Sequence, residues 1–164
     1  MTLFRLLAVL SVLACVVPGG PVRAQTDIAL GGLTADPTAP VEVTADALRV
    51  DQTTREAVFE GNVVIGQGDL RIAAGRVAVS YDDATGDIAR LVASGGVTFA
   101  TATEAAEATE AVYDLISGIL TLSGDVLLTQ GASALSADRM VVDLTAGTAR
   151  MEGRVRTVFA QAGP

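Results

Sequence analysis

The chain has 164 residues and an acidic balance, with 19 Asp and Glu against 11 Lys and Arg and no His. All the basic residues are Arg, and Cys15 is the single cysteine. These absences exclude nucleophiles activated by His, Schiff-base lysines, the lysine of a P-loop and the usual zinc sites. The acidic charge also argues against nucleic-acid binding, which needs basic patches.

The first 24 residues have the pattern of a cleavable secretory signal peptide. Arg5 supplies a short positive region, residues 6–17 form an apolar run, and Val22-Arg23-Ala24 is a cleavage site of the A-x-A kind. The apolar run is too short to span a bilayer. We therefore expect export of the chain and cleavage before Gln25.

Cys15 offers an alternative, because Val12-Leu13-Ala14-Cys15 loosely matches a lipoprotein acceptor pattern. The apolar run continues past this cysteine, so cleavage after Ala24 is favoured over lipidation. The expected organisation has four parts. They are a signal peptide (1–24), a flexible lead-in (25–40), a folded domain (41–159) and a C-terminal tail (160–164).

Four copies of one pattern occupy the predicted domain. In each copy an apolar or aromatic residue precedes an Asp, and a Gly-x-Val unit follows 10 to 13 residues later. The pairs are Asp51 with Gly61, Asp82 with Gly95, Asp114 with Gly124, and Asp143 with Gly153. A spacing of 29 to 34 residues between successive glycines marks repeated supersecondary units that cannot bury their apolar faces alone.

Each copy predicts a β-hairpin. The Asp can bond its own backbone to start a turn, and a Gly four residues later (Gly86, Gly118, Gly147) supplies the positive φ needed to leave it. Arg55 stands at this position in the first copy, so we expect that turn to differ. Alternating apolar and polar residues on both sides predict strands with one inward face. The Gly before each Val predicts a bulge or bend in the returning strand.

Two segments between the hairpins are interpreted separately. Residues 101–112 give the best helical pattern, with Glu104, Glu107 and Glu110 at i,i+3 spacing, but we favour a solvated acidic loop or short turn. Gly66-Gln67-Gly68 is interpreted as a hairpin turn and not as a phosphate loop, because no Lys or helix follows it.

The charged residues have a structural and a functional interpretation. The four turn aspartates could form a calcium ladder or a catalytic pair, but their position favours a role in the turns alone. A set of arginines could meet phosphate groups by bidentate hydrogen bonds, although solvated surface arginines are the default. This set is Arg71, Arg76, Arg154 and Arg156.

A family motif appears in the first copies. Residues 41–48 have the sequence VEVTADAL, residues 59–72 have FEGNVVIGQGDLRI, and RVAV follows at 76–79. Later copies repeat its parts, as in LSGDV at 122–126. On these residues, about 40–158 of the chain resembles the OstA-like family, and within it the LptA-type periplasmic lipopolysaccharide-transport proteins.

The resemblance implies an all-β fold, a twisted β-jellyroll in which two sheets of antiparallel hairpins enclose an apolar channel open at both ends. It implies no enzymatic activity and no cofactor. Lipopolysaccharide would be bound through lipid A, and the partners would be the inner- and outer-membrane components of the transport bridge. Copies of the chain would join head to tail through their edge strands.

The family's lipid-contacting positions correspond here to Val41, Val43, Phe99, Tyr113 and Leu115, and Leu115 falls in a predicted turn. Phe59 and Val97 lie in the same inward columns and complete the predicted lipid-binding set. The predicted partner edges are Val41, Glu42, Val43 and Thr44 at one end and Val155, Thr157 and Phe159 at the other.

Two other functions stay open on the residues alone. A purely structural or adhesive β-repeat protein with a dry core would have the same apolar columns. A carboxylate-dependent enzyme acting on polysaccharide would need two acids on one inward face. We disfavour the enzyme because the acids are expected at turns and outward positions.

Overall fold

The computed structural model describes residues 27–29 and 38–159, and within these ranges every regular element is a β-strand. The predicted signal peptide, Cys15, the C-terminal tail and most of the lead-in therefore lie outside the described residues. In the part of the chain that is described, no helix is long and apolar enough to cross a membrane. The strands are β1 (Asp27–Ala29), β2 (Glu42–Thr44), β3 (Ala47–Asp51), β4 (Glu56–Gln67), β5 (Leu70–Tyr81), β6 (Ile88–Ala100), β7 (Glu104–Asp114), β8 (Ile119–Gln130), β9 (Ser133–Asp143), β10 (Thr148–Glu152) and β11 (Arg156–Val158).

The strands form a single antiparallel sheet in the order β1-β10-β9-β8-β7-β6-β5-β4-β2. β3 pairs with the other half of β4, and β11 pairs with the other half of β9. The central strands β4 to β9 are each 11 to 13 residues long and pair with their neighbours in sequence. This meander follows from the repeated hairpins, because two antiparallel strands joined by a short turn are necessarily neighbours.

Register shifts divide each long strand pair into two halves. They fall between Glu60 and Val63, between Ser94 and Val97, and between Ser123 and Val126. A bulge bends its strand and increases the local twist, so the sheet folds over along this line. The bulges predicted at the Gly-x-Val units are thus confirmed.

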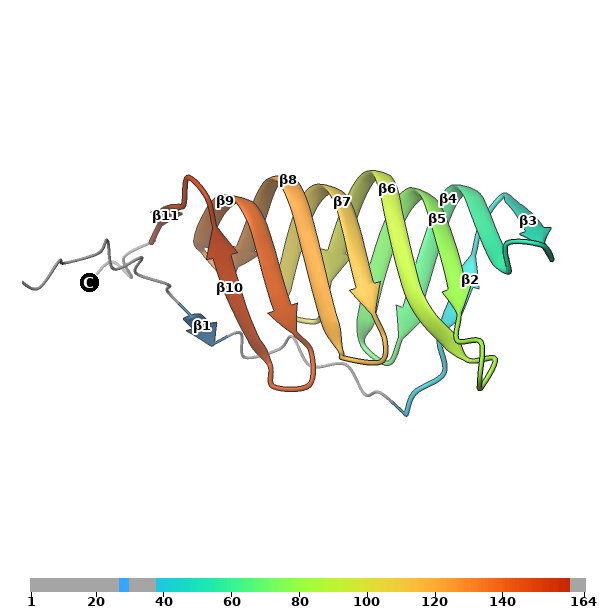
Figure 1. Ribbon diagram of the computed structural model, residues 1–164. Coiled ribbons are helices and arrows are strands. Elements are labelled where there is room, and N and C mark those ends of the chain that lie inside the picture. Colours follow the sequence, from blue (N-terminus) through green and yellow to red (C-terminus); the bar gives the residue numbers. More distant parts are fainter. Residues whose placement is uncertain (1–26, 30–37, 160–164) are drawn as a thin grey trace, which may run out of the picture.

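The bent sheet makes two layers around one interior (Figure 1). The first layer contains β3, β10 and the halves of β4 to β9 that end at the four Asp turns. The second layer contains β2, β11 and the remaining halves. In Figure 1 the long strands curve over along the top of the view, and the turns that join them lie along the bottom.

The corner where the layers meet has a specific backbone conformation. Gly61 and Asn62 both have positive φ (78° and 46°), and so do Gly124 with Asp125 and Gly153 with Arg154. Facing residues hold the corner. Asn62 Nδ2 donates to Asp46 Oδ2 at 2.7 Å, and Thr109 Oγ1 donates to the carbonyl oxygen of Gly124 at 3.2 Å.

The Asp turns form as predicted. Asp82 Oδ1 accepts hydrogen bonds from the backbone N–H groups of Ala84 and Thr85, and Asp51, Asp114 and Asp143 accept equivalent bonds. Arg55 nevertheless adopts the left-handed conformation (φ 54°) that Gly86, Gly118 and Gly147 adopt in the other turns. The expectation that the first turn differs is therefore wrong for the conformation at this position.

Residues 101–112 are neither a helix nor a loop. They contribute most of β7, which lies between β6 and β8 in the middle of the sheet. The helical spacing of the acids has another cause. Glu107 and Glu110 both face outward because the register shift between them reverses the alternation, whereas Glu104 faces inward and is buried.

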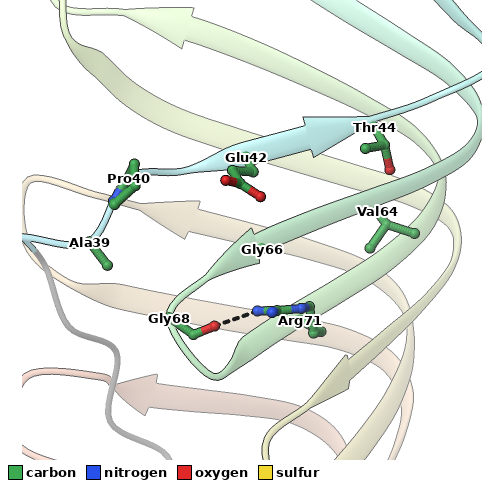
Figure 2. A pocket seen from close by; sticks show the side chains of 8 residues that line it. All are labelled: Ala39, Pro40, Glu42, Thr44, Val64, Gly66, Gly68 and Arg71. Carbon is green, nitrogen blue, oxygen red and sulfur yellow. Dashed lines mark hydrogen bonds between the residues drawn. The ribbon is translucent and has the colours of Figure 1, made fainter.

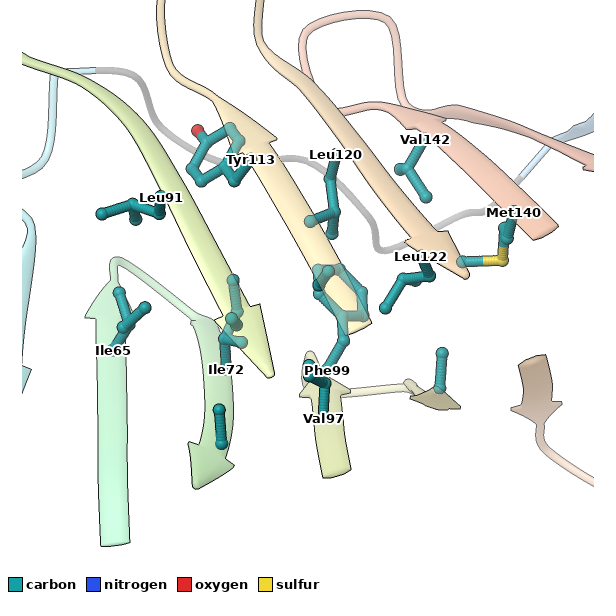
Figure 3. Close-up of a cluster of buried hydrophobic side chains, with 14 of the residues drawn as sticks. Ile65, Ile72, Leu91, Val97, Phe99, Tyr113, Leu120, Leu122, Met140 and Val142 are labelled. Atoms are coloured by element: carbon teal, nitrogen blue, oxygen red, sulfur yellow. The ribbon is translucent and has the colours of Figure 1, made fainter. Parts of the chain in front are cut away.

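The core lies between the layers and is almost entirely apolar. One inward row of the first layer runs through Val79, Leu91, Tyr113, Leu120 and Val142. Figure 3 shows part of this row facing Ile65, Ile72 and Phe99 of the second layer. The alternation fails at one end, where Leu48 and Val50 of β3 are 56% and 62% exposed, because no strand of the second layer covers them.

Candidate functional site

The seven predicted lipid-binding residues gather in one apolar cluster. Val97, Phe99 and Tyr113 are buried in its centre. Four others are partly buried and pack against it: Val41, Val43, Phe59 and Leu115. Leu115 follows the end of β7 and lies in the turn, as expected, yet it still contacts the core. The structure thus brings together residues from β2, β4, β6 and β7.

The interior is filled by the protein's own side chains. Phe99, Leu120, Leu122, Leu128, Met140 and Val142 have no exposed surface. Different strands come within 8 Å, Cα to Cα, only where they are hydrogen-bonded neighbours, so the two layers meet through side chains alone. A ligand between them must therefore displace side chains or separate the layers, whereas backbone hydrogen bonds can stay intact.

Apolar side chains are exposed at both ends of the two-layer structure. Leu48 and Val50 are exposed beside β4 at one end. Val155, Val158 and Phe159 are exposed at the other end, next to β9. The interior is thus continuous with apolar surface at each end, which is the arrangement expected of a channel with open ends.

The predicted partner edges lie at opposite ends of the second layer. β2 pairs only with β4, and β11 pairs only with β9, so each strand has one edge without a partner in the described chain. Glu42, Thr44 and Val155 are exposed, and Thr157 and Val43 face partly inward. Phe159 follows β11 and is 75% exposed.

Two buried polar residues were missed by the sequence interpretation. Gln67 is 4% exposed and closes β4, where its parity with Val63 and Ile65 points it inward. The Tyr113 hydroxyl donates to Gln67 Oε1 at 3.1 Å, and Gln67 Nε2 donates to the carbonyl oxygen of Ala39 at 3.3 Å. Burial raises the pKa of Tyr113 above its ordinary value, so the phenol is a neutral donor at physiological pH.

The second missed residue is Glu104, which contradicts the expectation that the acids lie at turns and outward positions. Its Oε1 accepts a hydrogen bond from Gln130 Nε2 at 2.8 Å, and Thr101 Oγ1 lies 3.5 Å from its Oε2. Its parity with the buried Ala106 in β7 could have signalled this position, had residues 101–112 been interpreted as a strand.

The four arginines of the predicted set are all exposed. Arg76 lies 3.6 Å from Glu60, and Arg154 donates from Nε to Asp138 Oδ1 at 2.9 Å. Arg71 donates to the carbonyl oxygen of Leu70 at 2.7 Å and borders a shallow hollow of about 330 Å³ (Figure 2). Arg154 and Arg156 border a second hollow of about 310 Å³ that also contains Asp125 and Asp138. Because carboxylates stand beside Arg154, that hollow is not built for phosphate.

The turn aspartates are used within their turns. Backbone N–H groups of Thr85 and Ala84 hold the pKa of Asp82 below its ordinary value, and those of Thr53 and Thr54 do the same for Asp51. In residues 27–29 and 38–159, no three Asp or Glu side chains come together in a group that could hold a metal ion. The arrangement supports the turn role that the sequence favoured.

With the geometry established, comparison with known proteins decides the family. A family model described as LptA/(LptD N-terminal domain) LPS transport protein matches residues 42–148. The chain belongs to this family. The resemblance predicted from the motif is thereby confirmed.

Two relatives extend the comparison. An uncharacterised protein of Rhizobium meliloti (strain 1021) is 26% identical over 168 residues, covering 94% of this chain and 90% of the relative. The crystal structure of LptH is that of the LptA-homologous periplasmic component of the lipopolysaccharide transport device from Pseudomonas aeruginosa. It matches with a TM-score of 0.69 at 16% identity, over 77% of this chain and 99% of LptH. This likeness confirms the β-jellyroll fold.

The motif of the LptA/LptD family has a clear structural meaning in this chain. The Ala-Asp pair before β3 and the Gly-Asn-Val unit inside β4 meet at the corner. Asp46 N–H donates to the carbonyl oxygen of Gly61, and the Asp46 carboxylate accepts from Asn62. Asp138 and Gly153 repeat the backbone bond in the last copy. These residues therefore bend the sheet and do not form a binding site themselves.

Proposed function

We propose that this chain is a periplasmic lipopolysaccharide-binding bridge protein that carries lipopolysaccharide from the inner to the outer membrane, with the acyl chains of lipid A held between its two layers. Membership of the LptA/LptD family supports the transport role. The saccharide stays in water, and each CH₂ group buried in the interior contributes about 0.8 kcal/mol. The chain supplies no chemistry, so movement is driven by other components of the system.

The observation that carries the proposal is an unbroken apolar interior that reaches exposed apolar surface at both ends. One inward row crosses the whole first layer. It consists of Leu48, Phe59, Val77, Ala93, Ala111, Leu122, Met140 and Met151. No charged side chain interrupts this row, so an acyl chain meets only apolar groups along it.

Photo-crosslinking in cells tests the ligand and the register together. A photoreactive phenylalanine replaces Phe99, which faces inward, or Val92, which faces outward beside the buried Leu91. We expect a lipopolysaccharide adduct from position 99 and none from position 92. No adduct at position 99 in folded, exported protein would contradict the proposal.

That negative outcome has a specific alternative, a structural or adhesive β-repeat protein with a dry core. The fully buried side chains of the interior favour this second candidate. The two functions differ in a simple measurement on purified protein. Added lipopolysaccharide raises the thermal midpoint of a lipid carrier by mass action, whereas it leaves that of a dry repeat protein unchanged.

We further propose that copies of the chain join head to tail, with β11 of one copy beside β2 of the next. An unpaired strand edge is a template for association unless charge, Pro or a covering segment blunts it. β2 carries one acid, Glu42, and β11 carries one base, Arg156, and neither contains Pro. The same edges would receive the inner- and outer-membrane components of the bridge.

A further inference from the structure

The two layers are joined by the chain along one long side only. At the corners each strand passes from one layer to the other, whereas the turns of both layers lie along the opposite side (Figure 1). We call that opposite side the seam. It is bordered by the Asp turns of the first layer and by the turns at 68–69, 101–103 and 131–132 of the second.

A hydrogen bond crosses the interior beside this seam. Tyr113 is the second-last residue of β7, just before a first-layer turn, and Gln67 is the last residue of β4, just before a second-layer turn. The Tyr113 hydroxyl donates to Gln67 Oε1 at 3.1 Å although the residues are 46 positions apart in sequence. Gln67 also donates to Ala39, in the segment before β2. One buried amide thus ties both layers and this segment together.

An apolar pair would fill the same space without needing partners. The inward neighbours of Tyr113 on adjacent strands are Leu91 and Leu120, and that of Gln67 is Leu70. A buried polar group that loses its partner costs about 1–3 kcal/mol, whereas apolar side chains separate without such a directional penalty. A polar pair at this place therefore favours the closed state while leaving an open state accessible, because water or a polar ligand can satisfy both groups there.

We propose that the Gln67–Tyr113 hydrogen bond is a latch on the seam, and that the lipid enters sideways when this bond breaks and the layers separate. This inference rests on the proposed lipid-carrying function. In the open state the hydroxyl and the amide face the polar headgroup at the seam, and the acyl chains replace side-chain contacts inside.

Entry along the seam fits the chemistry of the ligand better than threading from an end. Threading would drag a hydrated saccharide past side chains that have no exposed surface, such as Phe99 and Leu128. Burying sugar hydroxyls there without hydrogen-bond partners is strongly unfavourable. Sideways entry leaves the saccharide in water throughout and requires only that the seam open.

The test measures how fast the full-length exported chain takes up lipopolysaccharide that carries a fluorescent label on its sugar. Tyr113→Phe removes one oxygen and keeps the ring. Because a net hydrogen bond is worth about 0.5–1.5 kcal/mol, we expect uptake about two- to tenfold faster, with an unchanged release rate. Gln67→Leu should do the same, and the double variant should be no faster than either single one.

Tyr81→Phe is the matched control, because Tyr81 is the other tyrosine of the chain and is exposed at the end of β5. It should load at the rate of the unchanged protein. Circular dichroism and the thermal midpoint establish that each variant is folded.

The outcomes separate the latch from the function on which it rests. Unchanged or slower uptake by folded Tyr113→Phe, in an experiment where the unchanged protein binds, overturns the latch and leaves lipid carriage standing. Additive effects in the double variant also overturn it, because the two residues would then act separately. If the unchanged protein takes up no lipopolysaccharide, the proposed function is wrong and the latch falls with it.

Discussion

Phe99 is the largest side chain without exposed surface and lies in the middle of the interior. It pairs with Ile72 on β5 and with Ala106 on β7, so its ring stands over a small neighbour. Phe99→Ala removes these contacts and leaves a cavity. We expect a loss of about 3–5 kcal/mol in the free energy of unfolding, measured by urea titration.

Phe159→Ala is the control for this prediction. Phe159 is 75% exposed, so the same change should alter the free energy of unfolding of the monomer by no more than about 0.5 kcal/mol. A small effect of Phe99→Ala, similar to that of the control, would show that the interior is loosely packed and already open.

The turn aspartates give the protein a predictable acid sensitivity. Hydrogen bonds from the backbone of Thr85 and Ala84 hold the folded-state pKa of Asp82 below the unfolded value. The stability that this carboxylate contributes is therefore present above the unfolded pKa, about 3.9, and is lost as pH falls through the lower folded pKa. We expect Asp82→Asn to reduce the loss of thermal midpoint between about pH 5 and pH 2.

Asp69→Asn is the comparison, since Asp69 also lies in an exposed hairpin turn. Its pH profile should follow that of the unchanged protein. If Asp82→Asn leaves the acid-induced decrease unaltered, the turn bonds are not what the protonation disrupts.

At the scale of the strand, the corner is the element most sensitive to a single methyl group. Gly61 and Gly86 both have φ of 78°, so a side chain strains the backbone equally at the two positions. Their surroundings differ. A Cβ at Gly61 would lie 2.5 Å from Asp46 Oδ2, whereas a Cβ at Gly86 would meet nothing within 4 Å.

This pair separates backbone strain from crowding. Gly86→Ala should lower the free energy of unfolding by about 1–2 kcal/mol through strain alone. Gly61→Ala should cost more, because it also displaces the Asp46 carboxylate that accepts from Asn62. Urea unfolding of both variants provides the measurement. Equal losses would mean that the Asp46 contact does not hold the corner.

Features that depend on neighbours in sequence were predictable. The Asp turns and the bulges use backbone conformations that particular residue types select, so four copies of Asp and Gly at fixed spacing predict hairpins and bends. The inward positions of Phe59, Val97 and Phe99 follow from alternation within those strands.

Other features depend on partners far away in sequence. β7 has the composition of a helix or a polar loop, yet neighbouring strands supply hydrogen bonds and Gln130 satisfies the buried Glu104. The contact between Gln67 and Tyr113 crosses from one layer to the other, which no local pattern records. The exposure of Leu48 and Val50 arises because the second layer ends before it covers them.

For the whole molecule, the two uncovered ends predict how copies of the chain associate. Phe159 is 75% exposed beside the open edge of β11, and Leu48 and Val50 are exposed beside β4 at the opposite end. Joining these ends would bury apolar surface from both copies and extend one interior into the next. A charge at the joint must lose its hydration on association, so Phe159→Asp should shift the protein toward the monomer.

Ile116→Asp is a matched control, because Ile116 is also 75% exposed but lies in a turn along the side of the molecule. Sedimentation over a range of concentrations should show assembly of the unchanged protein and of Ile116→Asp, and its loss or a marked weakening in Phe159→Asp. Equal weakening by both changes would indicate lateral association. Because the edge of β2 is far from Phe159, a mixture of the Phe159→Asp variant with unchanged protein should give short, capped assemblies, which side-by-side packing cannot explain.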